Sequence, residues 1–484
     1  MRGEAQGLPR VCMTFLLRHQ QRVDPLYASG RGKQGRDTSL FSRAEEEKRL
    51  RRLSASSYTP TTELLLRMMD EGFSCSFLVS GLLLGELTEA DQNLSDLLRD
   101  AITHRQAEPL AESYYQSVIP LFREREEYRF QVDQHRSLIE DFSGRRPSIL
   151  VAPDSVFNRV VTMAAREMGF SAVYTDVFGK NTPGLSLEQQ YLADGMPVLI
   201  RHCELSDDIA IRFGDVDWNY HPLLPDTYAG WLATFHEGIV HIMVDMEAFG
   251  GRFPAESGIF TFLEELPAAL SDAGVQSILP GEAVAAASSP EEIPDELLES
   301  ASVAWPINMM QCTALEALRT AGRWVPDKTT YRRLTARDHF SYMATTSGSC
   351  GTLTDQRTQA DAYQYFTEYM KALSRFEEEQ INLVRAKSAV RILRCISPDH
   401  AFHFCTPYHR EGFSAHSLEE FAKLLDVASD ACILHHSESQ DFENWIRDIV
   451  RDDKLATEIH SLKSREEIQK AVDRRVLTLW NRLK

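Results

Sequence analysis

Two aspartates stand where apolar segments of the sequence end. Asp154 follows the run "SILVAP" (residues 148–153), and Asp245 ends the longer run "GIVHIMVD" (residues 238–245). A carboxylate that is partly removed from water at the end of a buried strand can act as a general acid or base. Two such carboxylates from different strands can act on the two sides of one bond, which is the arrangement that hydrolysis of a glycosidic bond requires.

Each aspartate also has a structural interpretation. Asp154 precedes the helical pattern "VFNRVVTMAAREMG" (residues 156–169), where an Asp can cap the first turn of the helix. Asp245 can order a loop by accepting hydrogen bonds from the backbone. Glu247 is either a second carboxylate of the site or a residue that faces solvent or belongs to a hydrogen-bond network. The residues alone leave both interpretations open for both aspartates.

Other polar side chains are candidates for contacting a substrate. Trp218 can present its aromatic face to a sugar ring. In "LTARDHFSYM" (residues 334–343), Asp338 and His339 either contact a substrate or cap a helix whose aromatic face packs inward. The remaining candidates from this pattern follow apolar runs in the first half of the chain and are His19, Gln20, Glu112 and Arg201.

The elements that must position these residues alternate from Val11 to about Pro280. Short apolar runs alternate with amphipathic segments whose apolar positions recur every three or four residues, which predicts a parallel sheet covered by helices. About seven or eight repeats favour a closed or nearly closed barrel, in which the ends of the strands converge on one face. The runs are "VCMTFLL", "CSFLVS", "EPLAES", "SILVAP", "SAVYT", "PVLIRH", "GIVHIMVD" and "VQSILP".

The pattern changes after this barrel, and we predict three domains. Residues 1–285 form the barrel, residues 286–388 a helical extension that packs on it, and residues 389–484 a small α+β module. In the module, "HAFHFCT" and "ACILHH" are predicted strands. Two of its predicted helices begin with capping boxes, Ser417 with Glu420 and Ser464 with Glu467.

Composition limits the class of partner. The 71 acidic residues outnumber the 52 basic ones and give a net charge of -19, which argues against nucleic acid and favours a neutral substrate. The 8 cysteines show no CxxC pair or metal-ligand spacing, and no GxGxxG turn follows a run, so we expect no metal and no dinucleotide. Without a segment long enough to span a bilayer, the sequence predicts a soluble cytoplasmic protein that does not bind membranes.

Five segments, in this order, resemble the motifs of glycoside hydrolase family 57, the α-amylase and α-glucanotransferase family. The resemblance covers about residues 10 to 375 and implies an incomplete (β/α)7 barrel with a helical extension. It implies action on α-1,4-glucans such as starch, glycogen and maltooligosaccharides, with no cofactor. It places Asp154 at the position of the nucleophile and Asp245 at that of the acid/base. The segments are "RHQQRVDP", "LAESYYQS", "LVAPDSV", "VDMEAFGG" and "ARDHFSYM".

The sequence departs from the family pattern at several positions. The nucleophile, ordinarily Glu, is Asp154, the first-motif proline is Gln21, and the second-motif histidine is Gln116. The Gly-Glu-His group after the acid/base appears as Gly250–Arg252. Replacing Glu by Asp withdraws the attacking oxygen by roughly 1.5 Å, and a misplacement of about 1 Å can cost about a hundredfold in rate.

Three outcomes therefore remain open. The protein is a slow retaining enzyme, an inverting hydrolase, or a catalytically inactive α-glucan-binding or scaffold protein. The tail from about Ala389 resembles an uncharacterised module that is attached to some proteins of this family. In the inactive alternative, this module is a candidate for contacting a partner protein.

Overall fold

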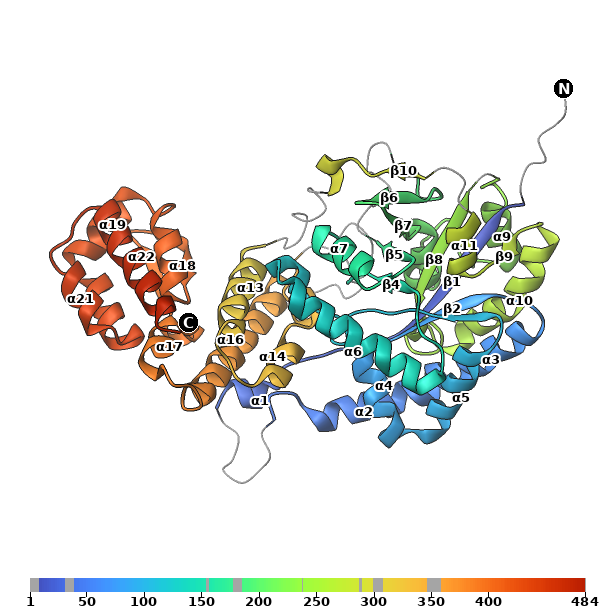
Figure 1. Ribbon diagram of the computed structural model, residues 1–484, viewed down its shortest axis with the longest axis horizontal. Helices are drawn as coiled ribbons and strands as arrows, with labels where there is room; N and C mark the ends of the chain where they lie inside the picture. The colour runs from blue at the N-terminus through green and yellow to red at the C-terminus, as the bar shows by residue number, and fades with distance from the viewer. Residues whose placement is uncertain are drawn as a thin grey trace. The chain divides into compact units, whose positions relative to one another are not determined.

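The computed structural model describes residues 8–30, 39–153, 156–176, 185–236, 238–286, 290–298, 308–345 and 358–483. Within these ranges the chain forms two compact units. The first contains residues 8–20 and those between 43 and 298, and the second contains residues 21–42 and those between 308 and 483 (Figure 1). Asp154 lies outside the described residues.

Among the described residues of the first unit, seven parallel strands form a ring. Ladders join β1 to β2 and β8, β2 to β3, β4 to β5, and β5 to β7. Among the described residues, the other two junctions are single bridges, Ala111 to Leu150 and Arg201 to His241. The ring is complete in strand order but weakly joined at these two seams, which confirms the predicted incomplete barrel. The strands are β1 (Arg10–Leu17), β2 (Cys75–Val79), β3 (Ala107–Pro109), β4 (Ile149–Val151), β5 (Ala172–Thr175), β7 (Met196–Ile200) and β8 (Ile239–Asp245).

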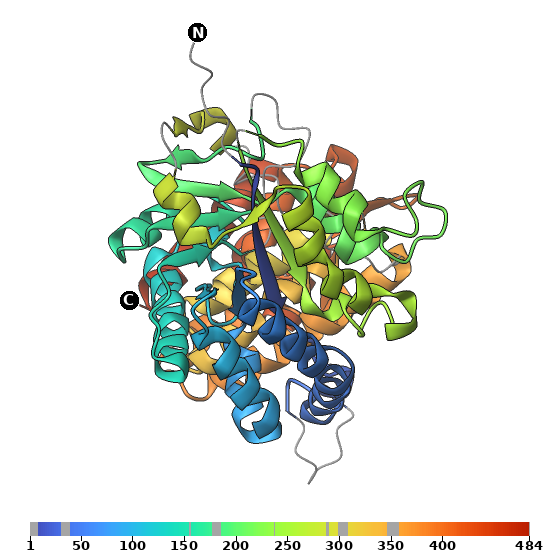
Figure 2. The same cartoon turned by 90° about the vertical axis from the view of Figure 1, so that its right-hand side faces the viewer.

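Helices lie outside these strands (Figure 2). The spacing of apolar residues explains their packing, because α10 (Ile259–Asp272) buries Ile259, Phe262, Leu263 and Leu266 along one face. The strands themselves are buried on both faces, as the five buried residues of β2 illustrate. The other helices of this layer are α2 (Arg43–Leu53), α3 (Thr59–Asp70), α4 (Gly81–Ala90), α5 (Gln92–Thr103), α6 (Arg125–Ser143), α7 (Arg159–Glu167), α8 (Cys203–Asp207) and α9 (Pro225–Leu232).

Short strands extend the ring at its edges. The run "VQSILP" contributes only β9 (Gln276–Ser277), which pairs with the start of β1, before α11 (Pro280–Ala286) begins. The apolar runs did not predict β6 (Tyr191–Ala193), which forms an antiparallel hairpin with β7, or β10 (Glu291–Glu292), which pairs with β6. β6 and β10 are two or three residues long, so they carry too little pattern to be recognised.

Where the structure describes it, the second unit is mainly helical and carries one antiparallel hairpin. The hairpin consists of β11 (Phe402–Cys405) and β12 (Arg410–Ala415). The predicted division at about residue 389 stays a prediction, since most of residues 308–483 belong to this one compact unit. Its helices are α1 (Pro25–Ala28), α13 (Met309–Gly322), α14 (Lys328–Leu334), α15 (Arg337–Ser341), α16 (Gln359–Ile381), α17 (Lys387–Leu393), α18 (Leu418–Leu425), α19 (Asp430–Glu438), α20 (Asp441–Trp445), α21 (Asp453–Ile459) and α22 (Arg465–Asn481).

One predicted strand of this unit was wrong. The segment "ACILHH" belongs to α19, because Ser429 caps the helix by accepting the N–H of Cys432 at 3.2 Å. Ser417 caps α18 as predicted, but the reciprocal bond of a capping box is missing. The Glu420 carboxylate instead accepts the N–H of His416 at 2.7 Å and the Thr313 hydroxyl at 2.8 Å.

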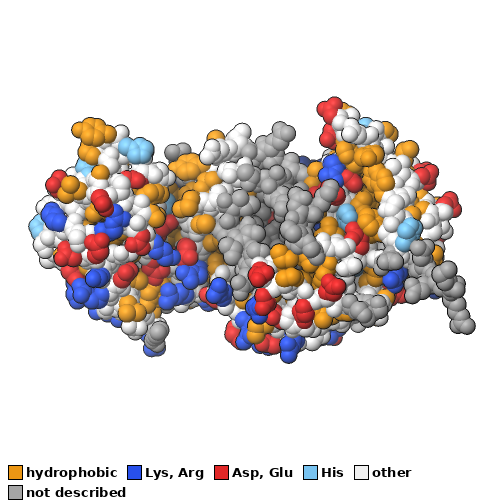
Figure 3. All heavy atoms as spheres, turned by 90° about the horizontal axis from the view of Figure 1, so that it is seen from above, with side chains coloured by type: hydrophobic (Ala, Val, Ile, Leu, Met, Phe, Trp, Pro, Cys, Tyr) orange, Lys and Arg blue, Asp and Glu red, His pale blue; other side chains and the backbone are white. Residues whose placement is uncertain are grey.

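The surface of the described residues is mixed in charge. On the face in Figure 3, Asp and Glu side chains are interspersed with Lys and Arg side chains. None of the described helices combines the length and the apolar composition that crossing a membrane would require.

Candidate functional site

The C-terminal ends of the ring strands bring most of the predicted residues to one edge. His19 and Gln20 follow β1, Glu112 follows β3, Arg201 follows β7, and Asp245 ends β8. Because the strands are parallel neighbours in one ring, their C-terminal ends share this edge. We call this edge of the first unit the strand-end site.

Asp245 has one of its two carboxylate oxygens fixed by the backbone. Its Oδ1 accepts the N–H of Glu247 at 3.0 Å and so caps the short turn Met246–Ala248. Among the described residues, Oδ2 has no hydrogen-bond partner, and the side chain is half-buried. The loop-ordering role and an acid/base role therefore use different oxygens of the same carboxylate.

Glu247 is held by an arginine that the sequence pattern did not reveal. Arg49 on α2 places Nη2 at 2.7 and 3.0 Å from the two Glu247 carboxylate oxygens, and its Nη1 donates to Gln20 Oε1. Burial and the nearby Asp245 carboxylate raise the pKa of Glu247, whereas Arg49 lowers it. Glu247 is thus part of a charged network that positions Gln20. Nothing in the basic run of α2 distinguishes Arg49 from Arg51, which is exposed.

His19 faces a carboxylate that was also missed. Its buried ring places Nδ1 at 3.3 Å from Glu86 Oε2, and its backbone N–H lies 3.4 Å from Ser80 Oγ. The carboxylate orients the imidazole toward one tautomer. A signal for Glu86 was present in the sequence, because it is the only charged residue in the apolar segment from Gly81 to Leu87.

Glu112 and Gln116 form a buried pair. The Gln116 Nε2 donates to both Glu112 oxygens, at 3.2 and 3.1 Å. Gln116 has a φ of 51°, a left-handed conformation that is strained for a residue other than glycine. The Glu112 N–H donates to Nδ1 of His135 at 3.2 Å, and burial lowers the pKa of His135 to about 4. A neutral His135 therefore fixes the backbone that carries Glu112.

Arg201 and Trp218 are each already engaged within the protein. Arg201 Nη2 lies 2.6 Å from Asp207 Oδ1 in a buried ion pair. The Trp218 ring packs partly against the core and meets the rings of Tyr220 and Trp231 at centroid distances of 5.6 and 6.3 Å. A substrate role for either residue stays a prediction.

The helix after β4 answers the capping question for Asp154. α7 begins at Arg159, and its N-cap is Asn158, whose Oδ1 accepts the N–H groups of Val160 and Val161 at 3.0 and 3.3 Å. The interpretation of Asp154 as the cap of this helix was wrong, because Asn158 caps it. The nucleophile interpretation of Asp154 stays a prediction.

Asp338 and His339 belong to the second unit, and the structure shows them packed inward. The His339 ring is fully buried, with Nδ1 at 2.7 Å from the Tyr365 hydroxyl and Nε2 at 3.1 Å from the Arg333 carbonyl oxygen. Burial lowers the pKa of His339 to about 3. Asp338 accepts the N–H of Gln21 at 2.9 Å. Asp338 is not a helix cap, since the N-cap of α15 is Ala336. Substrate roles for Asp338 and His339 stay predictions.

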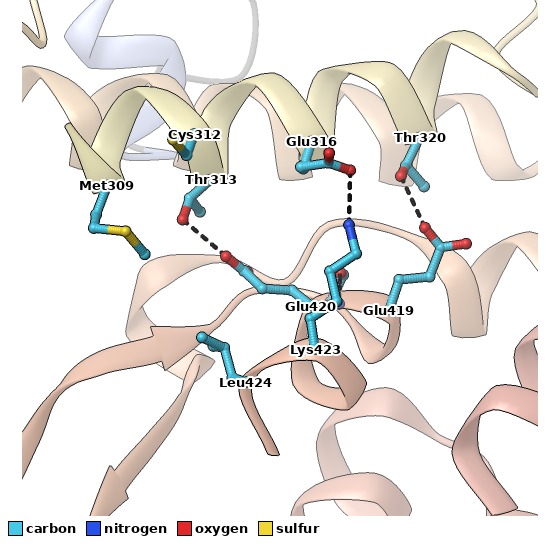
Figure 4. A pocket seen from close by; sticks show the side chains of 10 residues that line it. Met309, Cys312, Thr313, Glu316, Thr320, Glu419, Glu420, Lys423 and Leu424 are labelled. Carbon is cyan, nitrogen blue, oxygen red and sulfur yellow. Dashed lines mark hydrogen bonds and ion pairs between the residues drawn. The ribbon is translucent and has the colours of Figure 1, made fainter. Parts of the chain in front are cut away.

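The second unit also contains a cavity of about 290 Å³ between α13 and α18 (Figure 4). Its polar side chains bind one another across the gap. Thr313 donates to Glu420 at 2.8 Å, and Lys423 Nζ lies 3.2 Å from Glu316. These pairs explain how the two helices are held together, and we assign no substrate to this cavity.

Two groups of side chains within the described residues could hold a metal ion. In each group the candidate ligand atoms lie within 4.8 Å of one another. Each group combines residues from different elements, so spacing along the chain did not reveal it. The first group is His19, Glu46 and Glu86 at the strand-end site, and the second is Cys405, His435 and His436 in the second unit.

A protein-family model matches the part of the chain that carries the strand-end site. The model is described as "Glycosyl hydrolase family 57" and matches residues 17–298. The match includes every candidate residue of the first unit, whereas Asp338 and His339 lie beyond its end.

Individual relatives agree with this match. A Methanocaldococcus jannaschii protein described as "Putative alpha-amylase" is 32% identical over 215 residues, which cover 43% of this chain and 45% of that protein. The match to this chain therefore covers less than half the length of that relative. Solved structures share the fold at low identity.

A 4-alpha-glucanotransferase from Thermococcus litoralis has 16% identity and a TM-score of 0.51, covering 76% of this chain and 60% of its own. A GH57-type branching enzyme from Pyrococcus horikoshii has 12% identity and a TM-score of 0.52, covering 79% of this chain and 90% of its own. At these identities, the two structures establish a shared fold.

Proposed function

Because the chain belongs to glycosyl hydrolase family 57, we propose that it acts on α-1,4-glucans such as starch, glycogen or maltooligosaccharides. The residue that carries the proposal is Asp245, whose carboxylate stands at the C-terminal edge of the strand ring within the family match. One oxygen of Asp245 is held by the Glu247 N–H, which leaves the second oxygen to face a substrate.

In this proposal two carboxylates divide the work. Asp245 donates a proton to the glycosidic oxygen while Asp154 attacks the anomeric carbon, and water then releases the sugar with Asp245 acting as the base. Arg49 and Gln20 act as positioning residues through the Glu247 network. The shorter side chain of Asp154 makes slow turnover the expected result, because the attacking oxygen is withdrawn by roughly 1.5 Å relative to Glu.

The second candidate function is a catalytically inactive α-glucan-binding or scaffold protein. It is favoured by the way substituted positions are used within the protein. Gln116 occupies both oxygens of Glu112, and Arg252 donates its N–H to the Glu247 carbonyl oxygen at 2.6 Å. Substitutions at several positions around the two carboxylates are harder for the protein to compensate than the shortening of one carboxylate side chain. A protein partner of residues 389–484 belongs to this alternative.

One comparison of variants tests both functions. Purified wild type, Asp245→Asn, Asp154→Glu and Asp272→Asn are incubated with maltooligosaccharides and with glycogen, and both glucan binding and new reducing ends are measured. Asp272 is exposed at the end of α10, so Asp272→Asn is the control for replacing a carboxylate by an amide away from the site. We expect Asp245→Asn to lower kcat by about a thousandfold and Asp272→Asn to leave it unchanged.

The other outcomes decide between the candidates. Cleavage that persists in Asp245→Asn contradicts the role of Asp245. A wild type that binds glucan without cleaving it, together with cleavage by Asp154→Glu, establishes the inactive binding protein and shows that one methylene separates it from catalysis. Absence of both binding and cleavage in all four proteins would reject α-glucans as ligands.

A further inference from the structure

Three side chains with metal-binding atoms meet in the second unit, beyond the residues that match the family. Cys405 ends β11, and His435 and His436 lie in the last turn of α19. The Cys405 Sγ and one ring nitrogen of each histidine lie within 4.8 Å of one another. We propose that these three side chains bind one zinc ion. The proposal does not depend on the function proposed for the first unit.

His436 is held in the tautomer that a metal ligand at Nε2 requires. Its Nδ1 lies 2.8 Å from Asp441 Oδ2, and its Nε2 lies 3.0 Å from the backbone nitrogen of Cys405. With Nδ1 donating its proton to Asp441, Nε2 accepts the Cys405 N–H, so its lone pair points toward Cys405. A carboxylate behind a ligating histidine is a recurrent feature of zinc sites, because it fixes the tautomer and increases the basicity of the ring.

The surroundings leave one side of the group open to solvent. Cys405 and His435 are half-buried, whereas His436 is buried. The rings of Phe402 and Phe442 lie against the His436 ring at centroid distances of 4.8 and 5.3 Å and hold it in place. An ion can therefore enter from the side of Cys405 and His435. A water molecule can complete a tetrahedral set of ligands on that side.

The distances require a small local contraction. Ligand atoms around a tetrahedral zinc ion lie about 3.5 Å apart, given bond lengths of about 2.3 Å to sulfur and about 2.0 Å to nitrogen. Rotation of the half-buried Cys405 and His435 side chains can bring the ligand atoms closer together by about 1 Å. His436 Nε2 would exchange the N–H of Cys405 for the ion. The Cys405 thiol would release its proton to solvent as the sulfur–zinc bond forms.

The chemistry of the ligands selects the class of ion. One thiolate and two imidazoles suit zinc, whereas magnesium and calcium require oxygen ligands. The test is a titration of the metal-free full-length protein with Co²⁺, followed by displacement with Zn²⁺ and by a separate titration with Mg²⁺. Cobalt bound to a thiolate gives a charge-transfer absorption in the near ultraviolet, which reports on the sulfur ligand directly.

Matched variants separate this group from other thiols and histidines. Cys405→Ser and His435→Asn remove ligands, while Cys312→Ser and His409→Asn change a half-buried thiol and an exposed histidine elsewhere in the second unit. We expect about one equivalent of cobalt with a thiolate band in the wild type. The band is lost in Cys405→Ser, and the affinity for Zn²⁺ falls at least about tenfold in His435→Asn. Both controls keep the wild-type values.

The proposal is overturned if the wild type shows no thiolate–cobalt band. It is also overturned if Cys405→Ser and His435→Asn bind Zn²⁺ as tightly as the wild type does. Circular dichroism establishes whether each variant is folded. If Cys405→Ser fails to fold, the zinc affinity of His435→Asn decides, since His435 is half-buried and its ring contacts that of His436, another member of the same group.

Discussion

At the scale of single residues, Arg49 controls the charge at the strand-end site. Glu247 is largely shielded from water and close enough to Asp245 for the two carboxylates to repel each other, and both effects raise its pKa. Arg49 opposes them through its contacts with both Glu247 oxygens. Whether Glu247 is ionised next to the proposed acid/base therefore depends on Arg49 of α2, and not only on β8 and the turn that follows it.

Arg49→Gln is expected to raise the pKa of Glu247 further and to lower the free energy of unfolding by about 1–2 kcal/mol, because a partly buried ion pair loses one partner. Urea unfolding measures the loss. The matched control is Arg51→Gln on the same helix, where an exposed arginine lies 3.6 Å from Glu47. Its loss should stay below about 0.5 kcal/mol. Equal losses in the two variants would contradict the special position of Arg49.

Glu377 is a buried carboxyl group that should make the second unit sensitive to pH. It lies on α16, and its Oε2 accepts the N–H of Cys395 at 2.6 Å. Burial raises its pKa from 4.5 to about 8. The folded protein therefore holds a proton that the unfolded chain has released. Stability from this proton is complete below about pH 4.5 and is lost as the pH rises through about 8.

Glu377→Gln should remove this pH dependence, since an amide stays neutral. We expect the free energy of unfolding of the wild type, relative to that of Glu377→Gln, to fall between about pH 5.5 and about pH 7.5, by at most about 1.4 kcal/mol per pH unit. Urea unfolding at the two pH values gives this difference. Glu378→Gln, at an exposed neighbouring position, should retain the slope of the wild type. A difference that is independent of pH would show that Glu377 is ionised in the folded protein.

At the scale of elements, the strands of the ring could be predicted because they are buried on both faces. Such strands give continuous apolar runs, and the polar residue that ends each run marks the edge of the sheet. This local signal located β1, β2, β4, β5, β7 and β8 and placed Asp245 correctly. It also set the order of the ring, because parallel strands with helical connections follow one another around a barrel.

The same local signal failed where a contact in space decides the structure. A short apolar run such as "ACILHH" fits a strand or a helix equally well, and Ser429, which caps the helix, decides for α19. Arg49 reaches Glu247 across 198 residues of sequence. Cys405 and His435 meet only because β11 packs near the end of α19. Contacts of this kind leave no periodicity in the sequence.

The turn after β8 depends on a glycine. Gly250 has a φ of +83°, and a Cβ atom there would lie 1.8 Å from the carbonyl oxygen of Ser56. That oxygen belongs to the backbone of the turn Ser54–Tyr58 and cannot rotate away as a side chain can. The turn after β8 and the turn Ser54–Tyr58 therefore fit together only if residue 250 lacks a side chain.

Gly250→Ala should lower the free energy of unfolding by about 3–4 kcal/mol, the sum of the left-handed backbone strain and the steric clash. Gly258→Ala separates the two causes, because Gly258 has nearly the same φ of +82° and no atom within 4 Å of the added Cβ. Its loss should be about 1–2 kcal/mol. Thermal unfolding of both variants tests the difference, and similar losses would mean that the turn can move away from Ser56.

At the scale of the whole molecule, the net charge of the chain favours a neutral polymer over a polyanion as its ligand. The chain has a net charge of -19, so polyanions such as nucleic acids are repelled. An α-glucan carries no charge and is recognised by hydrogen bonds and by contacts with apolar faces. Two arginines of the strand-end site form ion pairs within the protein, Arg49 with Glu247 and Arg201 with Asp207, which fits a neutral ligand.

The affinity for a maltooligosaccharide should therefore change less than about twofold between about 0.05 and 0.5 M NaCl, because a neutral ligand releases no counterions when it binds. Isothermal titration calorimetry at several salt concentrations measures this dependence. A DNA oligonucleotide of similar length is the control, and it should not bind even at the lowest salt concentration. If the affinity for the sugar fell about tenfold or more across this range, free charges in the site would have to make the main contacts. That result would contradict the pairing of Arg49 and Arg201 within the protein and, with it, the assignment of a neutral glucan.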